Sequence, residues 1–332
     1  MSSDQIALTI GDPNGIGPEI AVKAAVSCLD DEAGMSAILV GDEHVIRHYV
    51  DRLYPDRTLL RFAYDHSEHR ALRYQPVTAL PEASFQPGVG CAEGGRATVA
   101  YVEAALGLMA RGHVRSIVAC PHSETNFNAA GIRFSGYPSL LARLKNVPED
   151  EVFLMLVGAG LRIVHVTLHE RLTDALARIT PVLVERAIRT TVRALSSLGI
   201  ERPKLGVFGI NPHAGEGGLF GDDDDQIVEP LVARLQAEGM DIEGPVGADL
   251  MLGRRGFDAF VAMYHDQGHI PIKLLAGRNS AAMSIGAGLM FSSVGHGSAF
   301  DIAGQGIADP DPVLRCIKLV AGASEFKESS SS

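Results

Sequence analysis

The chain has 332 residues, of which 46% are hydrophobic and 21% charged, a balance typical of globular proteins and unlike that of disordered ones. The length favours two packed lobes over one very large domain. The formal net charge of −11 offers little basis for contacts with a phosphate backbone, so we expect no nucleic-acid partner.

The cysteines and the first residues indicate where the protein works. The four cysteines have neither paired spacing nor the density of a disulfide scaffold, so we expect reduced thiols. The opening residues MSSDQ lack the basic and apolar regions of an export signal. The longest charge-free stretch, 279–300, holds too much glycine and serine for a bilayer span. We therefore expect a cytoplasmic protein without a membrane segment.

Short apolar runs alternate along the chain with segments of helical period. The runs predict buried strands, and the segments predict helices, two of which carry Pro18 and Pro181 in a first turn. Such alternation indicates an α/β fold with a largely parallel sheet. In chain order the predicted elements are helix 18–28, strand 37–40, helix 98–110, strands 117–119, 153–157 and 163–168, helix 182–195, strand 205–210, helix 226–237, and strands 260–263 and 283–285.

Three histidines, His169, His213 and His265, directly follow predicted strands or a turn at a strand end. The carboxyl ends of parallel strands are where α/β proteins place ligands, and neutral imidazoles suit a divalent ion such as zinc. A tight turn with an incidental histidine is an alternative for His213, and the separations match no zinc-finger signature. Alternation places His165 on the same strand face as His169, where a core histidine is the simpler interpretation.

Two loops are candidates for contacts with a nucleotide cofactor. Loop 11–18 opens a helix but does not match the dinucleotide fingerprint GxGxxG, although its aspartate could line a cleft. Loop 296–301 is a turn of small residues whose backbone N–H groups could approach a pyrophosphate, and a plain turn explains it as well. The candidate cofactor contacts are Asp12, His296, Gly297, Ser298 and Asp301.

Two groups of charged residues remain to be interpreted. Lys273 lies in an apolar segment, so it either extends its amine to water or is held there for function. The acidic run 222–225 is better explained by favourable charge at the start of the following helix than by a metal cluster.

Four motifs together resemble the 4-hydroxythreonine-4-phosphate dehydrogenase family over essentially the whole chain. They are GDPNGIGP at 11–18, NPHAGEG at 211–217, MYHDQG at 263–268 and HGSA at 296–299. The resemblance implies an isocitrate/isopropylmalate dehydrogenase-like fold, with two α/β lobes and a cleft between them. We expect a discontinuous first lobe, 1–130 plus 270–332, on the nucleotide side, and a second lobe, 131–269, with the metal and the dimer interface.

The same resemblance implies the cofactors and the assembly. It implies NAD, with NADP left open, and a divalent metal, zinc first among the candidates, on His169, His213 and His265. It also implies a homodimer with a shared active site, in which the third histidine reaches across from the other subunit.

Departures from the family pattern remove groups that would hold a phosphate. The lysine of a Pro-x-His-Lys stretch is missing from 121–125, Tyr137-Pro138 replaces a His-Thr pair, and Ala282 and Phe291 replace an asparagine and an arginine. Segments 119–122, 134–142, 152–170 and 268–276 instead resemble the terephthalate cis-dihydrodiol dehydrogenases of aromatic catabolism. That resemblance implies oxidative decarboxylation of 1,2-dihydroxy-3,5-cyclohexadiene-1,4-dicarboxylate to protocatechuate and CO2.

This reaction suggests roles for six further residues. A lysine beside a divalent cation is a candidate general acid or base. The candidates are Lys273 for proton transfer, Asp249 and Asp266 as supporting carboxylates, and His122, Tyr137 and Arg278 as contacts to the substrate carboxylates.

Two alternatives stay open. One is a 4-hydroxythreonine-4-phosphate or phosphothreonate dehydrogenase, which needs a phosphate site. The other is a non-catalytic small-molecule binding protein on the same fold, which the presence of all three histidines disfavours.

Overall fold

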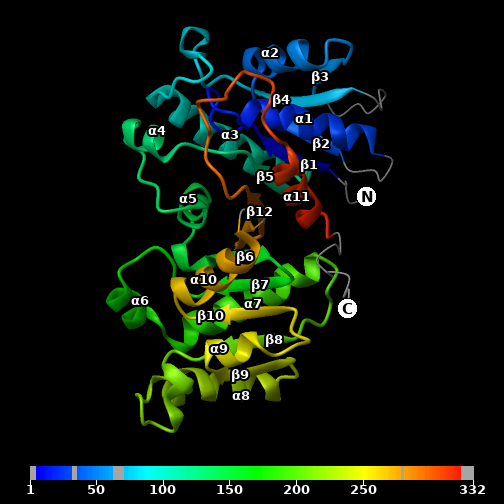
Figure 1. The fold of residues 1–332 in the computed structure, drawn as a ribbon. Helices are drawn as coiled ribbons and strands as arrows, with labels where there is room; N and C mark the ends of the chain where they lie inside the picture. Colours follow the sequence, from blue (N-terminus) through cyan, green and yellow to red (C-terminus); the bar gives the residue numbers. More distant parts are fainter. Residues whose placement is uncertain (1–4, 32–35, 63–70, 278–279, 323–332) are drawn as a thin grey trace. The chain divides into compact units, whose positions relative to one another are not determined.

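The computed structural model describes residues 5–31, 36–62, 71–277 and 280–322 (Figure 1). The chain divides into two compact units, one formed by Met1–Phe134 and Met290–Ala323 and the other built on Ser135–Leu289. Both are α/β, which confirms the predicted class. The sheet is large and mixed rather than wholly parallel, because one strand, described below, runs against its neighbours.

The described residues of the first unit form six strands in the order β3-β4-β2-β1-β5-β12, and every pair is parallel. Helix α1 packs against α2, α11 and β2, whereas α3 packs against α4, β1 and β5. The strands are β1 Gln5–Thr9, β2 Ser36–Asp42, β3 Leu59–Arg61, β4 Leu72–Val77, β5 Ser116–Ala119 and β12 Leu289–Ser293. The helices are α1 Gly17–Asp30, α2 Glu43–Leu53, the 3-10 turn η1 Glu82–Ser84, α3 Ala92–Ala110, α4 Glu124–Ala129 and α11 Asp311–Val320.

The second unit has the strand order β11-β6-β7-β10-β8-β9. Strand β6 is antiparallel to both β11 and β7, and the pairs from β7 to β9 are parallel. The strands are β6 Val152–Gly158, β7 Leu161–His165, β8 Leu205–Phe208, β9 Ile242–Val246, β10 Ala259–Ala262 and β11 Ala281–Gly286. The helices are α5 Tyr137–Leu144, η2 Glu149–Glu151, α6 Leu172–Arg178, α7 Pro181–Ser197, η3 Pro212–Glu216, η4 Asp224–Val228, α8 Glu229–Ala237, α9 Ala248–Leu252 and α10 His265–Ala276.

The antiparallel pair β6–β7 follows from a tight turn. Ala159 and Gly160 both have positive φ, at 49° and 73°, which is the geometry that reverses a chain within two residues. A parallel connection would instead need a long crossover. The short spacing between the two predicted strands therefore excludes a parallel pairing.

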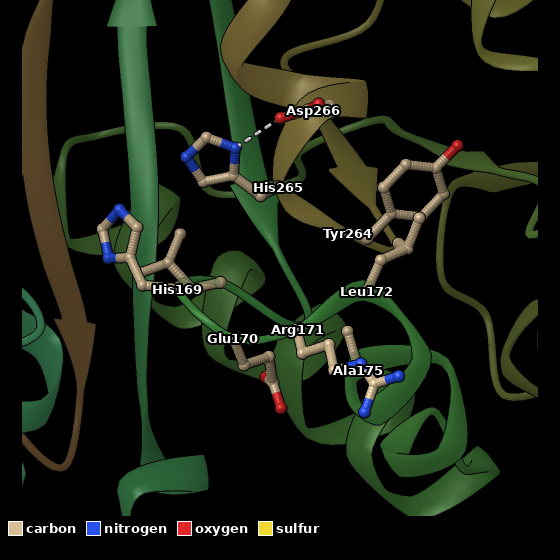
Figure 2. Close-up of a pocket in the computed structure, with 9 residues that line it drawn as sticks. His169, Glu170, Arg171, Leu172, Ala175, Tyr264, His265 and Asp266 are labelled. Atoms are coloured by element: carbon tan, nitrogen blue, oxygen red, sulfur yellow. Dashed lines mark hydrogen bonds and ion pairs between the residues drawn. The ribbon is translucent and has the colours of Figure 1, made fainter.

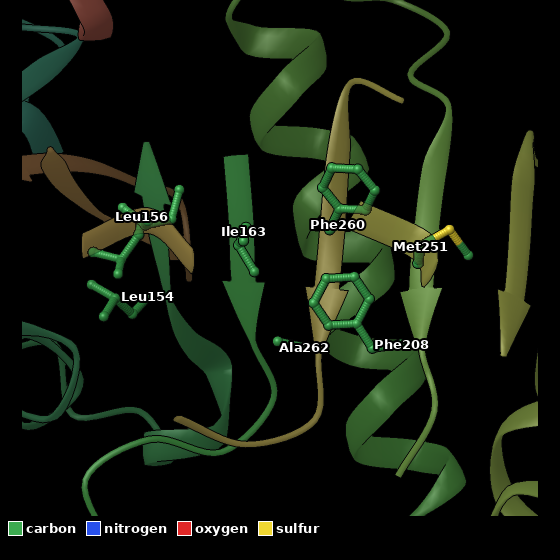
Figure 3. Packing of buried hydrophobic residues seen from close by; sticks show 8 residues of the cluster. Leu154, Leu156, Ile163, Phe208, Met251, Phe260 and Ala262 are labelled. Carbon is green, nitrogen blue, oxygen red and sulfur yellow. The ribbon is translucent and has the colours of Figure 1, made fainter. Parts of the chain in front are cut away.

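A hydrophobic cluster fixes helices α9 and α10 onto the sheet of the second unit (Figure 3). The rings of Phe208 and Phe260 lie 5.7 Å apart on neighbouring strands. Met251 of α9 and Ile272 of α10 join them and are fully buried. Full burial of such a side chain stabilises the fold by about 1.5–3 kcal/mol, so α10 is held firmly where it approaches β7 and β10.

Two boundaries differ from the sequence predictions. Strand β7 ends at His165 rather than at residue 168, so His169 is not on a strand face with His165. Residues 270–277 and 280–289, predicted to belong to the first lobe, lie in the second unit, because β11 pairs with β6 over its whole length and α10 packs against β6 and β7.

Two expectations about the chain as a whole can be compared with the structure. All four cysteines are free, as predicted. Among the helices of the described residues, none combines the length and the apolar character needed to cross a membrane.

Candidate active site

Three adjacent parallel strands, β7, β10 and β8, bring the predicted histidines to one edge of the sheet. Parallel neighbours end at the same edge, so the segments that follow them lie close together. Gln267 joins two of these ends: its side chain accepts from Met263 N at 2.8 Å and donates to Gly209 O at 2.8 Å. The strand pairing therefore assembles the site.

His169 and His265 lie together in this structure, with ring centroids 5.3 Å apart, and Figure 2 shows the two imidazoles turned toward each other. His169 Nδ1 lies 2.7 Å from Ser135 O, and His265 Nδ1 lies 2.7 Å from Asp266 Oδ1. In a neutral imidazole, a carbonyl or carboxylate acceptor holds the proton on Nδ1 and leaves the lone pair on Nε2. The two histidines border a pocket of about 580 Å³. It is lined by Leu168, His169, Glu170, Arg171, Leu172, Ala175, Tyr264, His265 and Asp266.

His213 lies outside this group in the single chain. Its Nδ1 is 3.0 Å from Glu216 Oε2, and the imidazole is exposed. Its φ of 53° is left-handed, a conformation that non-glycine residues rarely hold and that clusters at functional sites. Asp249 lies nearby, since a Cβ at Gly247 would meet both Asp249 Oδ1 at 2.9 Å and His213 Cα at 3.6 Å.

Asp224 holds the loop that carries His213. Its carboxylate is fully buried and accepts from Ile210 N at 2.7 Å and Asn211 N at 2.9 Å. Burial raises the pKa of Asp224, although these two hydrogen bonds act against the rise. One member of the acidic run 222–225 is therefore a loop anchor, a role that local helix-start chemistry did not reveal.

The site contains a further histidine, His269, that the sequence analysis did not select as a ligand. His269 stands one helical turn after His265, and the two rings stack with centroids 3.6 Å apart. One ligand atom from each of His169, His265 and His269 lies within 4.8 Å of the others. The i, i+4 spacing in HDQGH was the available signal, since it places both histidines on one helix face.

His165 lies behind His269 and is 1% exposed, as expected for a core histidine. Burial lowers the pKa of His165 to about 3, with nearby His269 acting in the same direction. Burial also lowers the pKa of His269 to about 4. Both rings are therefore neutral near pH 7, which is the form that binds metals.

Lys273 lies one turn after His269, on the same side of α10. The side chain is exposed rather than enclosed in apolar surroundings, and Nζ donates to Ser280 Oγ at 3.2 Å. Asp266, also exposed, contacts His265 as described above. Two of the three predicted catalytic residues, Lys273 and Asp266, thus lie on the histidine-bearing helix, and Asp249 lies beside His213.

The two predicted cofactor loops meet within the first unit. Ile16 N donates to Ser298 O at 2.9 Å, and both loops follow carboxyl ends of parallel strands, β1 and β12. Asp12 is fully buried and accepts from Asn14 N at 3.1 Å within its own loop and from Asn126 Nδ2 of α4 at 2.7 Å, so it anchors the loop. Ser298 Oγ and His296 Nε2 are buried and have no hydrogen-bond partner among the described residues, so they could take one from a ligand.

The remaining cofactor and substrate candidates differ in their surroundings. Asp301 and Gly297 are exposed. His122 stacks on Phe127 and meets Phe134 edge-on, and burial lowers its pKa to about 4. A neutral ring provides no positive charge for a carboxylate. Tyr137 is 6% exposed at the start of α5, and Arg278 lies outside the described residues.

The chain is similar to known proteins over most of its length. A family model described as pyridoxal phosphate biosynthetic protein PdxA matches residues 34–320. A 1,2-dihydroxy-3,5-cyclohexadiene-1,4-dicarboxylate dehydrogenase of Comamonas sp. is 46% identical over 95% of this chain and 96% of its own. The crystal structure of a terephthalate 1,2-cis-dihydrodiol dehydrogenase from Burkholderia xenovorans LB400 is 52% identical, with a TM-score of 0.79 over 96% of this chain and 97% of its own. A 4-hydroxythreonine-4-phosphate dehydrogenase of Maricaulis maris is 37% identical over 97% and 98%.

The anchor role of Asp224 gives a prediction about stability. Asp224→Ala leaves two part-buried backbone N–H groups, of Ile210 and Asn211, without acceptors, so we expect the free energy of unfolding to fall by about 1–3 kcal/mol in urea denaturation. Amide exchange in 210–218 should become faster at the same time. Asp225→Ala, an exposed neighbour, is the control and should change stability by no more than about 0.5 kcal/mol. Equal losses in both variants would contradict the anchor role.

Proposed function

We propose, from the premise that this chain belongs to the PdxA family and is a dehydrogenase, that it catalyses the metal-dependent, NAD-linked oxidative decarboxylation of terephthalate cis-dihydrodiol to protocatechuate and CO2. The observation that carries the proposal is the meeting of His169 and His265 at one pocket, with a third imidazole beside them. The predicted kinship with isocitrate and isopropylmalate dehydrogenases is part of the same proposal.

The substrate class is inferred from the relatives and from the charges at the pocket. The dihydrodiol dehydrogenases share more identity with this chain than the phosphate-using relative does. A dicarboxylate needs a cation in a protein whose overall charge repels anions. Arg171 lines the pocket, and its guanidinium can form a bidentate pair of hydrogen bonds with a carboxylate. We therefore add Arg171 to the candidate substrate contacts.

The donor set fits a divalent metal, with zinc as the first candidate. Neutral imidazoles with free Nε2 atoms are suitable ligands, and three of them lie within reach of one ion. The proposed ligand set is His169, His213 and His265. Two of them, His169 and His265, line the pocket and meet within one chain. A bound divalent ion would stabilise negative charge on substrate oxygens as a Lewis acid.

The cofactor is assigned to the first unit. Loops 11–18 and 296–301 offer backbone N–H groups and the two buried polar atoms of Ser298 and His296, which suit a polar ligand such as a pyrophosphate. Bound NAD would accept the hydride that leaves the substrate carbon.

The chain's own residues orient the substrate and move its proton. The secondary alcohol loses a hydride from carbon and a proton from oxygen, which leaves a ketone β to a carboxylate. Loss of CO2 from that carboxylate restores the aromatic ring. Lys273, positioned by Ser280, is the candidate that takes and returns protons, while Asp266 holds the tautomer of His265.

A homodimer accompanies this proposal, with a second copy of the chain as the occupant of an exposed apolar surface. On α10, Leu274 is 79% and Leu275 is 65% exposed, and on α6 Leu172 is 54% exposed. Such residues beside a ligand pocket are typical of an interface. A dimer would also allow a histidine from one subunit to complete the ligand set of the other.

The second candidate function is a 4-hydroxythreonine-4-phosphate or phosphothreonate dehydrogenase. It is favoured by the 37% identity to such a dehydrogenase over nearly the whole chain. It is disfavoured by the replacements at Tyr137, Ala282 and Phe291. A non-catalytic binding protein is not pursued, since the relatives reported above are dehydrogenases.

The first functional prediction concerns the substrate and the metal. Purified protein with NAD and terephthalate cis-dihydrodiol should form reduced nicotinamide and protocatechuate, because the family's phosphate-holding groups are replaced at Tyr137, Ala282 and Phe291. A chelator should abolish the activity, and added Zn²⁺ should restore it. 4-Hydroxythreonine 4-phosphate and phosphothreonate are the comparison substrates. Turnover with one of these alone would reject the dihydrodiol assignment.

The second functional prediction concerns proton transfer. Lys273→Ala should lower kcat by about 10²–10⁴-fold, the usual contribution of a general acid or base, while metal content stays unchanged. Steady-state kinetics and metal analysis measure the two effects. Lys204→Ala, at the amino end of β8, is the matched control and should keep full activity. An unaltered kcat in Lys273→Ala would refute the role.

The third functional prediction concerns the assembly. Light scattering should give twice the chain mass for the wild-type protein. Leu274→Glu places a charge on the proposed interface and should shift the protein toward the monomer. Ile307→Glu, at a residue of the first unit that is 65% exposed, should leave the mass unchanged. A monomeric wild-type protein would argue against the shared site.

A further inference from the structure

His269 occupies a place beside the predicted ligands that its neighbours on the helix do not share. Its ring stacks on His265 at an interplanar angle of 12° and lies 6.1 Å from the ring of His169. It is also the residue that completes the group of three within 4.8 Å in a single chain. Two positively charged imidazoles would repel each other at this separation, so at most one ring of the stack is charged, and neutral rings can bind a metal together.

Hydrogen bonds determine which nitrogen of His269 carries the proton. His165 Nδ1 lies 3.2 Å from Leu154 O, and a carbonyl can only accept, so the proton of His165 is on Nδ1. Its Nε2 is then an acceptor, and it lies 3.0 Å from Nδ1 of His269. His269 therefore donates from Nδ1, also toward His265 O at 3.3 Å, and keeps a lone pair on Nε2.

All three rings of the group are anchored in the same way. His169, His265 and His269 each use Nδ1 for a hydrogen bond, to Ser135 O, to Asp266 Oδ1 and to His165 Nε2 respectively. Each keeps Nε2 for another partner. In metal-ligating histidines, one ring nitrogen binds the metal and the other almost always donates a hydrogen bond. That hydrogen bond fixes the tautomer and the ring orientation.

Gly268 is a second observation about His165: the helix backbone at this glycine lies close to the His165 ring. A Cβ on Gly268 would lie well inside contact distance of His165 Nε2 and 2.8 Å from its Cε1. The backbone of Gly268 is helical, so any residue could hold its conformation, and the constraint is the close approach. The side chain that fills this space is the one that accepts from His269.

We propose that His269 is a ligand of the divalent metal, next to His169 and His265, and that His165 is a positioning residue that fixes the tautomer of His269. The inference rests on the proposed metal-dependent function, since it concerns the same ion. It adds a residue four positions after His265 that the motif-based ligand set does not contain. The His165–His269 pair would then tie the site to the interior of the second unit.

The test is a titration of the metal-free, full-length protein with Co²⁺, followed by its visible absorption, which reports both affinity and coordination. His269→Ala should weaken Co²⁺ binding at least about 10-fold and change the spectrum, because a nitrogen ligand is lost. His165→Leu should weaken binding by about 10–100-fold, the usual effect of losing a residue that supports a ligand. Gly268→Ala should act in the same direction, because it displaces the His165 ring.

Rescue separates positioning from packing. In His165→Gln, the side-chain amide can accept from His269 and donate to Leu154 O, so Co²⁺ affinity should return close to the wild-type value. His113→Ala, a histidine of the first unit, is the control and should bind Co²⁺ as the wild type does. Thermal unfolding of each metal-free variant establishes that it is folded, and His269→Ala carries the test by itself if a substitution at the buried position 165 prevents folding.

The outcomes distinguish this inference from the proposed function. If wild-type protein binds Co²⁺ and His269→Ala binds it with equal affinity and an identical spectrum, the ligand role of His269 is rejected while metal dependence stands. If binding weakens equally in His165→Leu and His165→Gln, His165 is not a positioning residue. If wild-type protein binds no divalent ion, both the inference and the proposed metal dependence fail.

Discussion

The parallel pairing of β7, β10 and β8 is the constraint on which the rest of the candidate site depends. Backbone hydrogen bonds between these strands place their carboxyl ends at one edge, and further bonds extend the alignment past the strand ends. Thr167 donates both N–H and Oγ to Met263 O, and Gln267 connects the ends of β10 and β8. The histidine-bearing segments are therefore placed by the sheet before any ligand is present.

Burial decides the chemical state of the histidines at this edge. His165 is enclosed by the sheet and by α10, so desolvation keeps it neutral, and its neutral ring in turn selects the tautomer of His269. The exposed ring of His169 and the half-buried ring of His265 are held by a carbonyl and a carboxylate instead. A cluster of imidazole nitrogens results, with Arg171 and Lys273 as nearby cations in an acidic protein.

Much of the fold could be predicted because apolar runs and helical periods are local properties. The predicted strands at 37–40, 117–119 and 153–157 lie within observed strands, and the one predicted at 260–263 overlaps β10. Errors arose where long-range pairing decides the outcome. Strand β7 stops at His165 because the chain then bends toward the end of β10, and β11 joins the second unit because it pairs with β6, more than 120 residues earlier in the chain.

The amino-acid sequence by itself determined that polar, histidine-bearing turns follow buried strands, because a strand end and its turn are neighbours along the chain. It could not reveal the contact between His165 and His269, which are 104 residues apart, or the loop anchor Asp224. Those contacts exist only after β7, β10 and α10 have packed with a glycine at position 268. Tertiary structure therefore decided which histidines face one another and which of their nitrogens stay free.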